Sequence, residues 1–151
     1  MDTILIADAR QRALATLAAA KAEELTAAMA LLADGPAVVD LKPVETGLVM
    51  LRGRTGGDGA PFNVGEATVT RAVVRAVTGE VGHGYRLGRD KQATRHAAII
   101  DAAWQSEARR ALIEARILEP IRVRIAAERE RASAEAAASR VEFFTLAREN
   151  T

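Results

Sequence analysis

The arginines in the middle of this chain are the residues best suited to binding chemistry. Arg71 and Arg75 lie in a segment that alternates between apolar and polar residues, and Arg86 follows in a second such segment. Guanidinium groups bind carboxylates and phosphates through paired, charge-assisted hydrogen bonds. Several arginines on one surface would therefore form a site for a phosphate-bearing ligand or for an acidic surface of another protein.

The position of these arginines depends on the turn between the two segments. Residues 66–77 and 80–88 predict two antiparallel strands, with Thr78-Gly79 as a two-residue turn. In that register Arg71 pairs with Arg86, and all three arginines share one face of the sheet. That face has a floor of glycines, namely Gly82, Gly84 and Gly88.

Two interpretations of the arginine face are open. In the simpler one, the arginines are merely solvated on an open sheet. Against it, Arg71 and Arg86 would repel each other directly unless an anion lay between them. Glycines also weaken an exposed strand unless another surface packs closely on it. A three-residue loop would place the arginines on the opposite face, so this prediction depends on the turn.

Other residues extend the candidate site. Asn63 and Glu66 flank the entry to the first strand and could act as acid–base or orienting groups, but no nucleophile–base pair is evident, so the catalytic residues are unknown. His83 would lie among apolar neighbours, which favours a buried or interface position. The remaining candidates for ligand or partner binding are Arg89, Lys91, Phe143 and Phe144.

Composition excludes several classes of site. The chain has no cysteine and only two histidines, which rules out disulfides and thiolate chemistry and makes an intrinsic metal site unexpected. The glycines at 56–59 lack the lysine of a phosphate-binding loop, and those at 82–88 do not fit a dinucleotide fingerprint. A net charge of +1, with Tyr85 predicted on the face opposite the arginines, disfavours nucleic-acid binding.

The pattern along the chain predicts an α+β fold. Apolar residues at helical spacing predict N-terminal helices over residues 8–33, with a break at Lys21–Glu24. Asp90 is the expected N-cap of a later helix. The other expected elements are strands at 38–41 and 46–52 around Lys42-Pro43, a glycine-rich loop at 53–65, helices over 107–139 with a restart at Pro120, and an extended segment at 141–146.

The 151 residues are expected to form a single domain in which residues 141–151 are a tail that docks on a partner. The apolar half of the composition is mostly alanine, valine and leucine, with only five aromatic residues. Such small side chains bury little area each, which favours obligate assembly with other proteins. No apolar run approaches membrane-spanning length, and the acidic Asp2 argues against a secretory signal, so we expect a soluble, cytoplasmic protein.

Five motifs in order along the chain resemble the PhnG family of the bacterial carbon–phosphorus lyase system. They are Pro43–Arg54, Gly59–Arg71, Gly82–Tyr85, Leu87–Lys91 and Val141–Arg148. The resemblance implies a subunit that helps to displace adenine from MgATP with an alkylphosphonate, giving ribose 1-alkylphosphonate 5-triphosphate. The implied partners are subunits I, H and J, with the ATPase-like subunits K and L.

The resemblance also implies a division of labour. MgATP would be a substrate of the complex, and no cofactor is expected on this chain. The chain would then be a structural or accessory subunit. The alternative is a subunit that binds the triphosphate or phosphonate directly through its arginines.

Overall fold

The computed structural model describes residues 2–32, 35–56 and 58–138. It confirms the predicted α+β fold, with helices before and after a three-stranded antiparallel sheet in the order β1-β2-β3. The elements are α1 (Asp2–Ala19), α2 (Ala22–Leu31), β1 (Val38–Arg54), β2 (Pro61–Ala76), β3 (Val81–Leu87), α3 (Lys91–Trp104), α4 (Glu107–Ile113), the π-helical turn η1 (Glu114–Leu118) and α5 (Glu119–Ala138).

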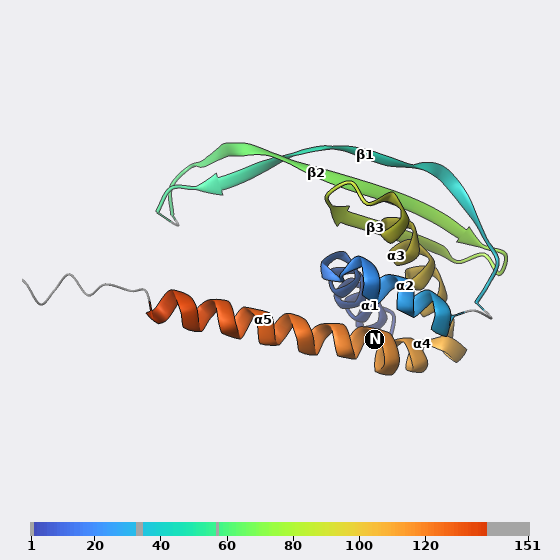
Figure 1. Ribbon diagram of the computed structural model, residues 1–151. Coiled ribbons are helices and arrows are strands. Elements are labelled where there is room, and N and C mark those ends of the chain that lie inside the picture. The colour runs from blue at the N-terminus through green and yellow to red at the C-terminus, as the bar shows by residue number, and fades with distance from the viewer. Residues whose placement is uncertain (1, 33–34, 57, 139–151) are drawn as a thin grey trace, which may run out of the picture.

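The sheet consists of two long strands and one short one. β3 pairs with β2 only from Val69 to Arg75. Beyond that stretch, residues 48–54 of β1 and 61–68 of β2 continue as a two-stranded ribbon, which we call the β1–β2 arm. Figure 1 shows this arm reaching past α1, α2 and α3, while α5 extends in the same direction on the other side of the molecule.

The core lies between the helices and one face of the sheet. Leu17, Leu25, Ile100 and Trp104 are almost completely buried among many alanines. A second cluster joins β2 to α3. The small-residue core expected from the composition therefore exists, and it depends on close approach of the backbones rather than on large side chains.

The glycines of β3 allow this close approach. A Cβ atom on Gly82 would lie 2.0 Å from the carbonyl oxygen of Ala98, and one on Gly84 would lie 2.1 Å from that of Thr94. Any side chain at either position would collide with the backbone of α3. The Gly82 and Gly84 part of the predicted glycine floor is thus covered by the protein's own helix, whereas Gly88 has no described atom within 4 Å of its Cβ position.

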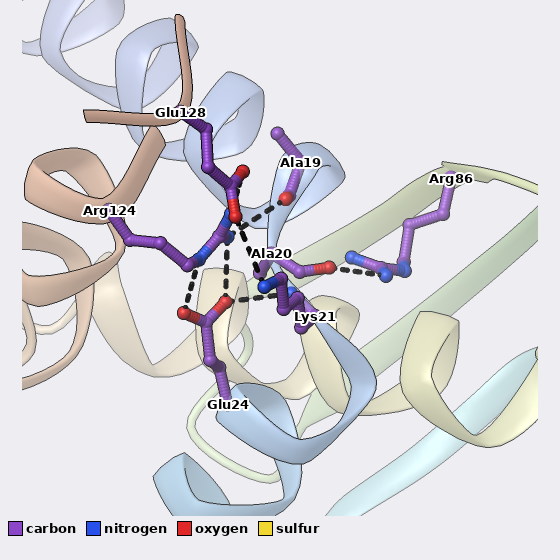
Figure 2. A network of polar contacts seen from close by, with 7 residues as sticks. All are labelled: Ala19, Ala20, Lys21, Glu24, Arg86, Arg124 and Glu128. Atoms are coloured by element: carbon purple, nitrogen blue, oxygen red, sulfur yellow. Dashed lines mark hydrogen bonds and ion pairs between the residues drawn. The ribbon is translucent and has the colours of Figure 1, made fainter. Parts of the chain in front are cut away.

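The predicted break at Lys21–Glu24 is confirmed as the junction between α1 and α2. The Lys21 backbone N–H donates to Glu24 Oε2 at 2.7 Å, which begins α2 in the manner of a capping box. Arg124 of α5 donates to both oxygens of Glu24, at 2.6 and 2.8 Å, and to the carbonyl of Ala19. Figure 2 shows how this network ties the junction to α5.

The strand prediction was too short in two places. Residues 38–54 form one strand with irregularities near Lys42 and Glu45, because β1 is an edge strand, where Pro43 and a bulge are tolerated. Most of the predicted loop at 53–65 is also strand, since Pro61–Gly65 pairs with the end of β1. The connection that remains is a short turn at the tip of the arm.

The C-terminal helical region is interrupted as predicted, close to Pro120. A proline cannot donate a backbone hydrogen bond and its ring crowds the carbonyl four residues earlier. The chain responds with the wider turn η1, in which the Glu119 N–H donates to the Glu114 carbonyl five residues back. The predicted extended segment at 141–146 lies outside the described residues.

Candidate functional site

The β2–β3 hairpin has a three-residue loop, so the predicted two-residue turn is wrong. The Ala76 N–H donates to the Glu80 carbonyl at 2.9 Å, and Gly79 adopts a φ of 108° that favours glycine. The register is therefore Arg71 opposite Tyr85 and Thr70 opposite Arg86. This is the one-residue slip that reverses the faces.

The slip separates the three arginines that were expected on one face. Arg71 and Arg75 lie on the exposed face of the sheet, whereas Arg86 lies on the face covered by helices. His83 is exposed on the same face as Arg71 rather than buried. Tyr85 also joins the exposed face, which removes the register argument against RNA binding, although the net charge of +1 still disfavours it.

Arg86 caps the end of α1. Its guanidinium donates to the carbonyl oxygens of Leu17 at 2.5 Å and Ala20 at 2.6 Å (Figure 2 shows the Ala20 bond). These carbonyls carry the partial negative charge of a helix C-terminus. Burial lowers the pKa of Arg86 from its ordinary value. Arg86 therefore serves the fold, and its hydrogen bonds are not directed to an external ligand.

A buried carboxylate that the sequence analysis missed organises the edge of β3. Asp101 is fully buried and accepts hydrogen bonds from Arg10 at 2.8 and 3.0 Å and from the His83 backbone N–H at 2.9 Å. The hydrogen bond with Asp101 raises the pKa of Arg10. The available signal was a lone acidic residue within the apolar stretch Ile99–Trp104 of α3.

The exposed face of the sheet has a shallow hollow at the irregular part of β1. Its volume is about 210 Å³, and it is lined by Lys42, Pro43, Glu45, Arg71 and Val73. Arg71 lies 3.6 Å from Glu45, and both side chains are more than half exposed. An ion pair so open to water contributes little to stability. Arg71 and Lys42 are therefore accessible to an anionic group of another molecule.

The β1–β2 arm is the second candidate surface, and its apolar character was not foreseen. Asn63 and Glu66 lie on it, opposite Arg52 and Met50, and all four are exposed. The arm also exposes large apolar side chains, namely Leu48 (64%), Met50 (60%), Leu51 (46%), Phe62 (49%) and Val64 (60%).

These apolar residues are not confined to one side of the arm. Leu48 and Met50 are on the side continuous with the helix-covered face, and Leu51 is on the other. The signal in the sequence was the unbroken apolar run 48–51, which is typical of a strand covered on both faces.

The structure places none of the other candidate residues from the sequence on either surface. Arg89 and Lys91 are exposed on either side of Asp90, whose carboxylate accepts the Ala93 N–H at 2.9 Å and caps α3 as predicted. Phe143 and Phe144 lie outside the described residues. Within the described part of the chain, no three histidine, aspartate or glutamate side chains come together as a metal site.

The described helices include none with the length and apolar character needed to cross a bilayer.

Comparison with known proteins identifies relatives across nearly the whole chain. Residues 8–149 match the family described as phosphonate metabolism protein PhnG. A curated protein of Rhizobium meliloti (strain 1021), alpha-D-ribose 1-methylphosphonate 5-triphosphate synthase subunit PhnG, is 51% identical over 139 residues. That alignment covers 92% of this chain and 88% of the relative.

Proposed function

Because this chain belongs to the PhnG family of phosphonate metabolism proteins, we propose that it is the corresponding subunit of an alpha-D-ribose 1-methylphosphonate 5-triphosphate synthase. In this role it supports the displacement of adenine from MgATP by an alkylphosphonate. MgATP is then a substrate of the complex, and this chain supplies no cofactor. We assign the catalytic chemistry to the assembled complex and name no catalytic residue in this chain.

Within that complex, we propose a structural role in which the β1–β2 arm inserts between surfaces of a partner subunit. The carrying observation is the set of five apolar side chains exposed on both sides of a ribbon only two strands wide. Such a ribbon is only marginally stable in water by itself. A partner that covers both faces would bury those side chains and fix the ribbon.

The proposed partners are subunits I, H and J, with the ATPase-like subunits K and L joining the same assembly. The family implies this set, and the name of the Rhizobium relative supports membership of a multi-subunit enzyme. A cytoplasmic location follows from the same proposal, since the substrates MgATP and an alkylphosphonate would meet there.

The test is co-expression of the tagged chain with subunits I, H and J, followed by affinity capture and size-exclusion chromatography. Replacing Leu48 and Phe62 together by serine should reduce capture strongly, because it removes apolar surface whose burial would drive the association. The matched control replaces Val77 and Val123, which are 74% and 60% exposed outside the arm, by serine and should assemble normally. Equal capture of the two variants would contradict the proposal.

A further inference from the structure

A second hollow lies between α1 and the C-terminal helices, away from every residue that the sequence singled out. Its volume is about 500 Å³, within the range of small-molecule sites. It is lined by Ala9, Arg12, Trp104, Arg110, Glu114 and Arg122. Three arginines from α1, α4 and α5 thus meet one carboxylate around a single concave surface.

The carboxylate is already engaged. Glu114 Oε1 accepts the indole N–H of Trp104 at 2.7 Å, and Oε2 accepts a hydrogen bond from Arg122 at 2.7 Å. Both oxygens are therefore committed to groups of the protein. The residues that line the hollow carry an excess of two positive charges, of which Glu119, 3.7 Å from Arg122, offsets one, so the hollow stays positive and attracts an anion.

The other two arginines leave donors available to the hollow. Arg110 stacks on the Trp104 ring, with its guanidinium carbon 4.7 Å from the ring centre, and donates to the backbone carbonyls of Trp104 and Gln105. Within the described residues, the Arg12 guanidinium has no hydrogen bond or ion pair, and the residue is exposed at the mouth of the hollow.

We propose that this hollow binds the phosphate or phosphonate group of a small molecule. The proposal rests on the proposed function, because it makes the chain a carrier of the substrate's tetrahedral anion as well as a structural subunit. Arginines from three helices suit a tetrahedral group with three outward oxygens. A planar carboxylate needs only one bidentate arginine to balance its charge, as in the Asp101–Arg10 pair.

The turn η1 builds this site. It begins at Glu114 and directly precedes α5, the helix that carries Arg122. π-helical turns occur often at functional sites. Here the turn leaves Glu114 in reach of both Trp104 and Arg122.

The experiment measures binding of methylphosphonate, inorganic phosphate and tripolyphosphate to the full chain, alone and in the co-expressed complex, by calorimetry and phosphorus NMR. Acetate is the planar control. Arg12→Gln should weaken binding by about tenfold or more, because it removes a charged hydrogen bond. Arg131→Gln carries the same charge change on exposed α5 and should bind as the native chain does.

Glu114→Gln distinguishes anion binding from a purely structural role of Glu114, which would not change the affinity for anions. The amide keeps an acceptor for the Trp104 indole but removes the negative charge, so the affinity for the anions should rise. Thermal melting of each variant checks the fold.

The proposal is overturned if no saturable binding is found in either form of the protein, if Arg12→Gln and Arg131→Gln bind equally, or if acetate binds as well as phosphate. If Arg12→Gln instead blocks assembly without any anion binding, the hollow receives an acidic group of a partner, and the proposal is also wrong. The Leu48/Phe62 variant tests the structural role independently. Its normal assembly would refute that role without touching this site.

Discussion

The side chains of Asp101 and Arg10 form a two-pronged ion pair, at 2.8 and 3.0 Å, that joins α3 to α1. Asp101 is fully buried, whereas the Arg10 side chain is 29% exposed. The same carboxylate holds the His83 backbone N–H, and Arg10 reaches the Val81 carbonyl at 2.9 Å. The pair thus fixes the outer edge of β3 against two helices.

Breaking this pair should be costly. Asp101→Asn leaves Arg10 without its counter-charge and is expected to lower the free energy of unfolding by about 3 kcal/mol. The matched control is Asp40→Asn, which breaks the Arg95–Asp40 pair, whose side chains are 37% and 38% exposed. That change should cost less than about 1 kcal/mol. Urea unfolding of both variants measures the two losses. Equal losses in the free energy of unfolding would show that the burial of Asp101 does not strengthen its ion pair.

Gly82 should not tolerate a side chain. The carbonyl oxygen of Ala98 lies 2.0 Å from the position that a Cβ would occupy, and the Ala102 nitrogen lies 2.7 Å from it. Gly82→Ala should therefore lower the free energy of unfolding by about 3 kcal/mol through overpacking. The matched control is Gly65→Ala on the β1–β2 arm, where no described atom lies within 4 Å of the Cβ position. This change should be neutral or slightly stabilising. Thermal melting distinguishes the two, and a stable Gly82→Ala chain would contradict the packing of α3 on β3.

The register of the hairpin shows where sequence reasoning reaches its limit. Alternation identified both strands, the cap at Asp90 was found from local chemistry, and the break at Lys21–Glu24 was found because the apolar stripe is interrupted there. A loop of two or three residues at Val77–Gly79 satisfies local preferences equally well, since Gly79 serves either turn. The choice is made by α3, which requires Gly82 and Gly84 on its own side. Such a contact between distant segments cannot be read from the strands alone.

The arginines of the candidate sites show the same limit. Arg71 and Arg75 are close in sequence and were found, but Arg12, Arg110 and Arg122 meet only because three helices pack together. No spacing rule links residues that are about one hundred positions apart. The apolar arm was missed for another reason, because its far end was assigned to a glycine-rich loop.

Arg86 is expected to stabilise the fold of the free chain. Arg86→Met removes the donors to the carbonyls of Leu17 and Ala20 while keeping the aliphatic stem, and should cost about 1–3 kcal/mol. Arg89→Met, at an exposed neighbouring position, should change stability by less than about 0.5 kcal/mol. A ligand-binding role would leave the free chain unaffected, so equal unfolding free energies for Arg86→Met and the native chain would contradict the capping role.

His96 should make the chain less stable in mild acid. This half-buried side chain has a buried Nδ1 without a hydrogen-bond partner among the described residues. Its pKa is lowered from the ordinary 6.5, first by burial and then by Arg95, with Asp90 acting in the opposite sense. The unfolded chain therefore binds more protons than the native chain as pH falls, and the free energy of unfolding rises with pH in this window.

The stability contributed by neutral His96 is complete above pH 6.5 and is lost as the pH falls through that value toward the lower native pKa. Glu24, whose pKa is lowered chiefly by its hydrogen bond with Arg124 from an ordinary 4.5, loses its contribution only in stronger acid. Urea unfolding between about pH 7.5 and 5.5 should thus show a slope that His96→Gln removes and that His83→Gln, at an exposed position, retains. A slope that survives in His96→Gln would assign the acid sensitivity to another group.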